Sequence, residues 1–216
     1  MENKKRILCF GDSNTWGYCA DTNARYADDE RWTQQLQANL GAAYMIVEEG
    51  ISGRTTVFDD PLNEGLSGIA HLTTILGSHA PLDALVIMLG TNDCKERFSA
   101  SPQNIADGVD RLIRKAKTLD VWRTVPRILV VAPIVIGIGC YTSAVAGEMG
   151  DGCVEKSRVL PALMRQCAET NACSYLDCNL FVHPNQIDWM HFDLQSNATF
   201  AQAMQTALEK MFEKEE

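Results

Sequence analysis

Five short, continuous apolar runs constrain what this chain can fold into more than any other feature. They cover residues 6–10, 44–47, 84–89, 128–132 and 174–176. Strands buried on both faces of a parallel sheet have this uninterrupted apolar character, because neither face meets water. The stretches between the runs carry helical periodicity. This alternation predicts an α/β fold in which helices connect five strands of a parallel sheet.

Local signals mark where several helices begin and end. Helices predicted over residues 31–40 and 68–76 are each followed by a glycine, which is a common helix stop. A third helix has Ser101 as its N-terminal cap and Pro102 in its first turn. The apolar stripe predicted for this helix consists of Ile105, Val109, Leu112, Ile113 and Ala116.

Two further helices complete the predicted pattern. One covers residues 154–170 and contains Pro161, which predicts a kink or a late start because proline lacks a backbone donor and clashes with the preceding turn. The last covers residues 194–213 and has Asp193 as its cap. It is expected to pack on the sheet through Phe200, Met204, Leu208 and Met211.

The connections that follow the strands are long, whereas those that lead into the strands are mostly short. The long connections are residues 11–30, 48–65, 90–101, 133–152 and 177–192. All of them leave the carboxyl ends of the strands, which is the edge where open α/β sheets bind ligands. We therefore place the candidate active site there. No linker or repeat divides the chain, so residues 1–216 are predicted to form a single domain.

The composition excludes several kinds of partner. The 216 residues include 28 acidic and 19 basic side chains, and the resulting net charge of −9 opposes nucleic-acid binding. The longest uncharged apolar stretch, residues 128–140, is shorter than the roughly 20 residues of a membrane-spanning helix. The start of the chain lacks the apolar region of a secretory signal. We expect a cytoplasmic protein with no membrane contact.

No sequence pattern for a cofactor is present. The eight cysteines are spread along the chain without a CxxC pair, which favours reduced, mostly buried thiols over disulfides or a zinc site. The sequence contains neither an HExxH motif nor a glycine-rich phosphate loop. We therefore expect no metal and no nucleotide cofactor.

One serine and one histidine could act together in catalysis. The first predicted strand ends in FGDS, which places Ser13 at a tight turn, although serines at turns more often serve only as caps. A nucleophilic serine needs a base, and His191 lies in the last long connection, three residues after Asp188. At that spacing the carboxylate can accept the imidazole Nδ1–H and leave Nε2 to take the serine proton.

Acyl transfer also requires donors for the oxyanion that forms on the reacting carbonyl. Gly53 lies in the connection after the second predicted strand, where its backbone N–H can approach a substrate closely. Asn92 follows the third strand and can donate through its side-chain amide. Each residue has an ordinary role in turns as an alternative. Their joint placement at one edge of the predicted sheet, together with the serine and histidine, favours the catalytic interpretation.

These segments resemble the four blocks of the SGNH (GDSL-like) hydrolases. The blocks are FGDS ending at Ser13, SGRT containing Gly53, GTND containing Asn92 and DWMH ending at His191. The longer strings RILCFGDS, RWT and IMLGTND resemble the bacterial arylesterase and acyltransferase subgroup. The resemblance extends from Arg6 to the last predicted helix.

The resemblance implies a flavodoxin-like, three-layer α/β/α sandwich and serine esterase chemistry without a metal. In the family pattern Ser13 is the nucleophile, His191 the base and Asp188 the residue that orients the base. The backbone N–H groups of Ser13 and Gly53 and the Asn92 amide form the oxyanion hole. Close members of the subgroup form ring-shaped homo-oligomers, often octamers, so a homo-oligomer is expected here too.

Two positions near the serine call for separate interpretation. Asn14 departs from the leucine that usually completes the first block, and we expect no effect on catalysis because no proton or oxyanion contact falls at that position. Trp16 is predicted to form a wall of the substrate pocket, with packing in the core as the alternative.

The sequence thus predicts a serine esterase that hydrolyses small short-chain esters, or transfers their acyl group, through an acyl-Ser13 intermediate. No apolar lid helix is predicted, which favours short acyl chains. A carbohydrate acetylesterase that acts on xylan or xylo-oligosaccharides is one alternative, in which Trp16 or Trp189 would stack on a sugar ring. A noncatalytic small-molecule binding domain is another, but it does not account for the serine, glycine, asparagine and histidine set.

Overall fold

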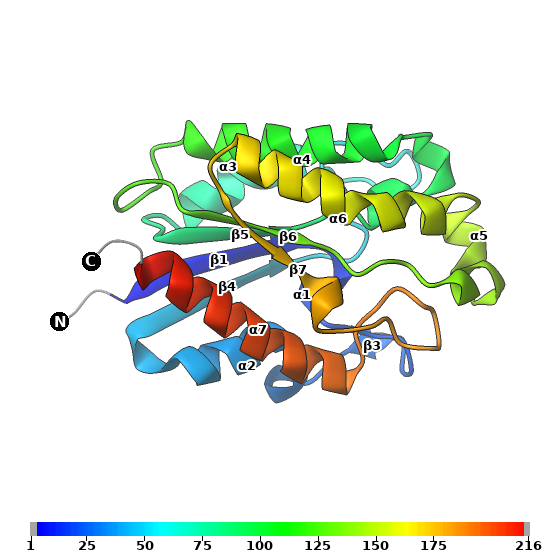
Figure 1. Ribbon diagram of the computed structural model, residues 1–216, viewed down its shortest axis with the longest axis horizontal. Helices are drawn as coiled ribbons and strands as arrows, with labels where there is room; N and C mark the ends of the chain where they lie inside the picture. Colours follow the sequence, from blue (N-terminus) through cyan, green and yellow to red (C-terminus); the bar gives the residue numbers. More distant parts are fainter. Residues whose placement is uncertain (1–3, 214–216) are drawn as a thin grey trace.

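A computed structural model describes residues 4–213, so the first three and last three residues of the predicted domain lie outside the described chain. The strands are β1 (Lys5–Gly11), β2 (Tyr18–Cys19), β3 (Ala24–Arg25), β4 (Tyr44–Gly50), β5 (Ala84–Met88), β6 (Ile128–Ala132) and β7 (Ser174–Asp177). The helices are α1 (Ser13–Trp16), α2 (Trp32–Leu40), α3 (Gly68–Ser78), α4 (Pro102–Lys117), α5 (Ala146–Met149), α6 (Cys153–Thr170) and α7 (Leu194–Glu213). Figure 1 shows these elements in three layers, with the sheet in the middle.

The main sheet has five strands in the order β4-β1-β5-β6-β7, and every neighbouring pair is parallel. The predicted five-stranded parallel sheet is therefore confirmed. The chain begins in β1 near the middle, adds β4 on one side and then continues outward through β5 on the other. This reversal of direction brings the connections after β1, β4 and β5 together at the carboxyl edge.

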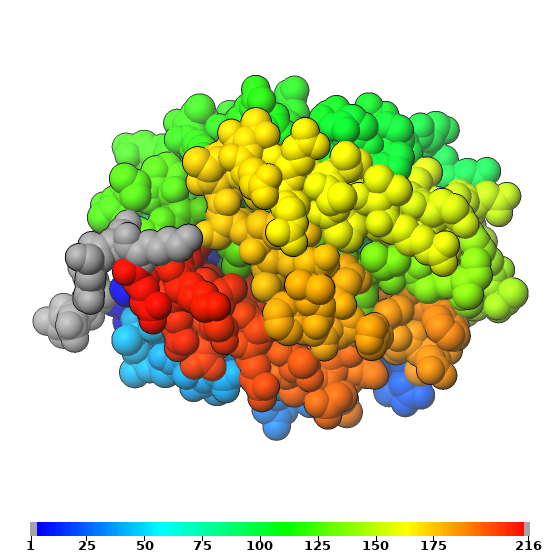
Figure 2. Space-filling model, viewed as in Figure 1, coloured from blue at the N-terminus to red at the C-terminus, as the bar shows by residue number. Residues whose placement is uncertain are grey.

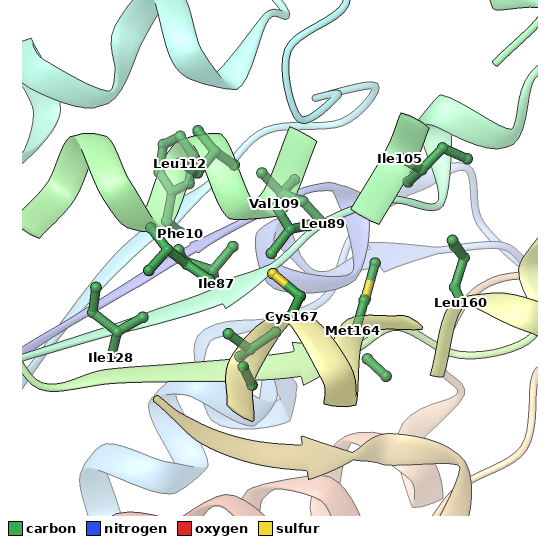
Figure 3. Close-up of a cluster of buried hydrophobic side chains, with 14 of the residues drawn as sticks. Phe10, Ile87, Leu89, Ile105, Val109, Leu112, Ile128, Leu160, Met164 and Cys167 are labelled. Carbon is green, nitrogen blue, oxygen red and sulfur yellow. The ribbon is translucent and has the colours of Figure 1, made fainter. Parts of the chain in front are cut away.

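Alternate residues of the strands face two separate apolar layers. In β1, Leu8 and Phe10 pack with the side chains of α3, α4 and α6, whereas Ile7 and Cys9 pack with those of α2 and α7. Figure 3 shows part of the first layer, where Val109 and Leu112 of α4 lie above Phe10 and Ile87 of the sheet. Burial on both faces explains why the strands read as unbroken apolar runs.

The helices agree with the sequence patterns except in two details. The predicted stripe of α4 and the predicted apolar face of α7 are both buried. Helix α6 begins at Cys153 and continues through Pro161, so the predicted late start is wrong. Its contacts with α4 and β6 hold it in place despite the missing backbone donor. Helix α3 likewise continues through Gly77 and ends at Ser78.

The long connections contain short elements that periodicity did not predict. They include α1 directly after β1, the small β2–β3 hairpin, α5 within residues 133–152 and several short 3-10 helices. In Figure 2 the segments near residues 20, 145 and 187 close on one another at the right-hand end of the molecule, which is the carboxyl edge of the sheet. These connections are therefore folded against each other rather than extended into solvent.

Two further sequence expectations concern cysteines and membranes. All eight cysteines are free, and all but Cys173 are buried, in agreement with the predicted buried thiols. Within residues 4–213, no helix has the length and apolar character needed to cross a membrane.

The start of α4 provides a test of the capping interpretation. Ser101 Oγ accepts a hydrogen bond from the Asn104 N–H at 3.1 Å, and Asn104 Oδ1 accepts one from the Ser101 N–H at 3.1 Å. Replacement of Ser101 by alanine is expected to lower the free energy of unfolding by about 1 kcal/mol, measured by urea denaturation. Ser101→Gly is the matched control and should cost only a few tenths of a kcal/mol. Equal losses for the two variants would contradict the capping role.

Candidate active site

Ser13 is held at the carboxyl end of β1 by a short helix. Asp12 caps α1 through a hydrogen bond from the Asn14 N–H to its Oδ1 at 3.0 Å, and Ser13 is the first residue of that helix. The helix lies directly on β4, because a Cβ on Gly50 would be only 2.1 Å from the backbone nitrogen of Trp16. Ser13 therefore has a fixed backbone, and it is 5% exposed.

Three side chains predicted to act together lie in hydrogen-bonding order. Ser13 Oγ is 2.7 Å from His191 Nε2, and His191 Nδ1 is 2.6 Å from Asp188 Oδ2. All three residues are buried, which strengthens the electrostatic interactions among them. The imidazole, with its Nδ1–H directed at the carboxylate, has Nε2 free to accept the serine proton.

The backbone around Asp188 folds back on the carboxylate. Trp189 adopts a left-handed conformation with φ of 64°, so the chain turns back toward Asp188 at this residue. Asp188 Oδ1 then accepts hydrogen bonds from the N–H groups of Met190 (3.1 Å) and His191 (3.2 Å). Asn185 Nδ2 donates to the same oxygen at 2.9 Å. Burial alone would raise the pKa of Asp188, but the hydrogen bonds and the nearby imidazole outweigh it and lower that pKa. The carboxylate thus stays ionised beside His191.

Asn185 and Asn14 are two site residues whose contribution the sequence motifs did not indicate. The Asn14 side chain donates from Nδ2 to the Met190 carbonyl at 3.1 Å and accepts from the Phe192 N–H at Oδ1 at 2.9 Å. These two backbone groups flank His191. The expectation that Asn14 has no effect on catalysis considered only proton and oxyanion contacts, and it did not anticipate these hydrogen bonds to the backbone beside His191.

The candidate oxyanion donors come from two other connections. Gly53 has φ of 88°, a conformation that side-chain-bearing residues rarely adopt, and its N–H has no acceptor among the described residues. Asn92 Nδ2 donates to the Arg54 carbonyl at 3.1 Å, which fixes the direction of its amide. Both residues line the same cavity as Ser13 and His191. The structure thus brings together the residues of all four sequence blocks.

Arg54 and Asp93 keep these connections in place. The Arg54 guanidinium lies over the Phe10 ring and donates to the Gly11 carbonyl at 2.9 Å, and its burial lowers its pKa to about 10. Asp93 accepts hydrogen bonds from the N–H and hydroxyl of Thr56, while its burial raises its pKa to about 6. Arg54 therefore holds the loop after β4 against the end of β1, and Asp93 joins that loop to the connection after β5.

The cavity beside Ser13 has a volume of about 150 Å³. Its lining residues are Ser13, Tyr18, Ser52, Gly53, Asn92, Lys95, Val145, Glu148, Met149, Met190 and His191. Tyr18 forms the wall that was predicted for Trp16, with its ring 4.5 Å from the His191 ring. The Trp16 ring instead lies against the Arg25 guanidinium at 5.2 Å. Helix α1 ends at left-handed Gly17, so the chain turns and presents Tyr18 to the cavity.

Trp189 is also absent from the lining of this cavity. Its indole packs closely on the backbone of Gly137 and Gly139, and its carbonyl accepts the Gly137 N–H at 2.8 Å. Trp189 therefore joins the connection after β6 to the loop that carries His191. No group of three or more histidine, cysteine, aspartate or glutamate side chains suited to a metal ion occurs within residues 4–213.

The fold and the site together have the arrangement of an α/β serine hydrolase, in which a carboxylate orients an imidazole and the imidazole activates a hydroxyl. A family model described as "GDSL-like Lipase/Acylhydrolase family" matches residues 9–199. The chain therefore belongs to this family, and with it to the carboxylic ester hydrolases. The resemblance of the four sequence blocks is confirmed, and the interpretation as a noncatalytic binding domain is set aside.

Solved structures and one curated protein show which relatives the chain resembles. The aryl esterase of M. smegmatis is 33% identical, with a TM-score of 0.88 over 96% of this chain and 99% of that one. A carbohydrate acetylesterase family member from Sinorhizobium meliloti is 34% identical, with a TM-score of 0.88 over 96% of this chain and 98% of that one. An acetylxylan esterase of Xylanibacter ruminicola is 34% identical over 97 residues, which are 44% of this chain but only 18% of that protein.

The contacts of Asn14 predict that this side chain holds His191 in position relative to Ser13. Asn14→Ala would leave the Met190 carbonyl and the Phe192 N–H without these partners and loosen His191 relative to Ser13. We expect the free energy of unfolding to fall by about 2 kcal/mol and the kcat for p-nitrophenyl acetate to fall about tenfold or more. KM should change little, because the cavity lining is retained.

Asn197→Ala is the matched control for this change. Asn197 is also buried, and its side chain bonds to the Trp32 N–H (3.1 Å) and the Asp193 carbonyl (3.0 Å), not to the two backbone groups that flank His191. Its replacement should lower stability while kcat stays near the wild-type value. If the Asn14 variant lost stability but kept the wild-type kcat, Asn14 would have a purely structural role.

Proposed function

We propose that the protein is a serine esterase that hydrolyses small short-chain esters, or transfers their acyl group, through an acyl-Ser13 intermediate. The observation that carries this proposal is the hydrogen bond of 2.7 Å between Ser13 Oγ and His191 Nε2, with Asp188 bound to the other ring nitrogen. An alcohol becomes an effective nucleophile when an oriented base removes its proton during attack. Family membership supports the same chemistry.

The proposed reaction has two halves with balanced proton transfers. His191 Nε2 takes the Ser13 proton as Oγ bonds to the ester carbonyl carbon, and Asp188 stabilises the imidazolium. Collapse of the tetrahedral intermediate breaks the bond to the alcohol, which leaves with the proton from His191. Water or another alcohol then gives a proton to His191 and attacks the acyl carbon. The second collapse releases the acid or the new ester, and Ser13 Oγ recovers its proton.

The backbone N–H groups of Ser13 and Gly53 and the Asn92 amide are the proposed oxyanion donors. Donors held in place before the reaction stabilise the negative charge of the intermediate without a cost of reorganisation. The support is that Gly53 and Asn92 line the cavity beside Ser13 and that the Arg54 carbonyl directs the Asn92 amide.

The size of the cavity supports short acyl chains, because about 150 Å³ leaves room for little beyond a small ester. A carbohydrate acetylesterase is the second candidate. It is favoured by the similarity to the S. meliloti carbohydrate acetylesterase family member and to the acetylxylan esterase. Stacking of a sugar on Trp16 or Trp189 no longer supports it, since neither ring lines the cavity. The expected homo-oligomer and cytoplasmic location stay predictions.

Replacement of Ser13 by alanine tests the covalent mechanism. We expect kcat/KM for p-nitrophenyl acetate to fall by about 10³-fold or more, because the nucleophile is lost while the fold is retained. The rates should be measured for p-nitrophenyl acetate, butyrate, octanoate and a peracetylated xyloside with both proteins. Preference for acetate would support the short-chain esterase, and a strong preference for the xyloside would support the second candidate. Retention of a substantial part of the activity by the variant would exclude Ser13 as nucleophile.

Replacement of Asn92 by alanine tests the oxyanion hole separately. Loss of one side-chain donor is expected to lower kcat by roughly 10²-fold or more. A fluorophosphonate probe, which forms a tetrahedral adduct on an activated serine, should label this variant more slowly than the wild type and should not label Ser13→Ala. An unchanged kcat would remove Asn92 from the set of oxyanion donors.

A further inference from the structure

An ion pair between a buried lysine and an exposed glutamate forms part of the cavity beside Ser13, and the proposed mechanism does not use it. Lys95 is 2% exposed, and its Nζ donates to Glu148 Oε1 at 2.5 Å. Lys95 follows the short 3-10 helix η3 (Asn92–Cys94), whereas Glu148 belongs to α5. Both side chains line the cavity. The pair therefore connects two loops across the space that a substrate of Ser13 would enter.

The backbone places Lys95 close to the proposed oxyanion donor. The Lys95 N–H donates to the Asn92 carbonyl at 3.1 Å, so the two residues belong to one turn. The Lys95 side chain and Asn92 also line the same cavity, so a substrate held there by Asn92 can reach the Lys95 ammonium. Glu148 marks the outer side of the cavity, because its side chain is 55% exposed. The leaving alcohol of an ester must depart toward that open side, whereas the acyl group stays on Ser13.

Hydrogen-bonding capacity is left over at this pair. An ammonium group has three N–H donors, and Glu148 is the one acceptor that the structure describes for Lys95 Nζ. A carboxylate has about four acceptor positions. A substrate hydroxyl can accept from the ammonium and donate to the carboxylate at the same time. An alkyl group in the same place would remove water from both charged groups without replacing its hydrogen bonds.

The surrounding charges favour a neutral substrate over an anionic one. Arg97 Nη2 donates to the Glu148 carbonyl at 3.1 Å, and Arg97 Nη1 lies 3.7 Å from Asp60 Oδ1. Two cationic side chains are thus matched by two carboxylates, Glu148 and Asp60. A carboxylate or phosphate on the substrate would have to compete with Glu148 for Lys95. A hydroxyl joins the pair without displacing either member.

We propose that Lys95 and Glu148 determine specificity by binding a hydroxyl on the alcohol part of the ester, so that the substrates are acetates or similar short acyl esters of polyhydroxylated alcohols. This inference rests on the proposed role of Ser13 and adds a substrate class to it. It assigns recognition of the alcohol to hydrogen bonds from a charged pair and not to an aromatic platform.

A pair of matched substrates tests the inference. Glycerol monoacetate and propyl acetate have the same acyl group and the same three-carbon chain, and they differ in their hydroxyls. The quantity to measure is the ratio of their kcat/KM values in the wild type, Lys95→Met and Glu148→Gln. The intrinsic reactivities of the two esters are the same for every variant, so they cancel when ratios are compared.

We expect Lys95→Met to lower the glycerol monoacetate preference about tenfold, the effect of losing a hydrogen bond to a charged group. Glu148→Gln should lower it about threefold, because the amide still accepts a hydrogen bond but carries no charge. Lys117→Met is the matched control. Lys117 is the last residue of α4, and its Nζ donates to the carbonyl of Asn171 at the end of α6. Its replacement should leave the ratio within about twofold of the wild type.

The outcomes separate this inference from the proposed function. A ratio unchanged by Lys95→Met, with both esters still hydrolysed, would overturn the specificity role and leave the serine mechanism intact. If Lys95→Met does not fold, the more exposed Glu148→Gln decides, and an unchanged ratio in that variant would likewise overturn the role. Absence of Ser13-dependent hydrolysis of any ester by the wild type would overturn the proposed function, and the specificity inference with it.

Discussion

The contact between Ser13 and His191 joins residues that are 178 positions apart in the chain, and the arrangement of the carboxyl edge depends on it. Ser13 is fixed by α1 on β1 and β4, whereas His191 lies in the last connection before α7. The two segments are held together by the Asn14 amide, which bonds to the backbone on both sides of His191. Because a hydrogen bond tolerates little displacement, the sheet and the two helical layers must be rigid enough to keep these segments in register.

Burial of charge at this edge is balanced locally by hydrogen bonds. Asp188 has enough donors to lower its pKa despite burial, whereas burial dominates for Asp93 and raises its pKa to about 6. The two carboxylates therefore differ in environment and in use. Asp188 holds the imidazole, and Asp93 holds Thr56 in the loop that carries Gly53 and Arg54. The same connections that supply the candidate donors thus also supply the groups that keep them in place.

The cavity combines apolar walls with one charged pair. Val145, Met149 and Met190 contribute apolar side chains to its lining, whereas Lys95 and Glu148 contribute charged groups. The two tryptophans that were expected to stack on a sugar are not part of this lining. Trp189 packs on Gly137 and Gly139, and Trp16 lies outside the cavity. The proposed recognition of the alcohol therefore uses the charged pair and neither tryptophan.

The sequence alone determined the five strands, their parallel direction and the four blocks that meet at the carboxyl edge, because these depend on burial patterns and on local backbone requirements. The helix through Pro161, the exchange of Trp16 for Tyr18 and the role of Asn14 were decided by tertiary structure. The partners of these residues lie far away in the chain: Asn14 bonds to the backbone around position 191, and Lys95 pairs with Glu148 from another connection. Local patterns carry no information about such partners, since a polar side chain has the same appearance in a sequence whether it meets water or a buried backbone group.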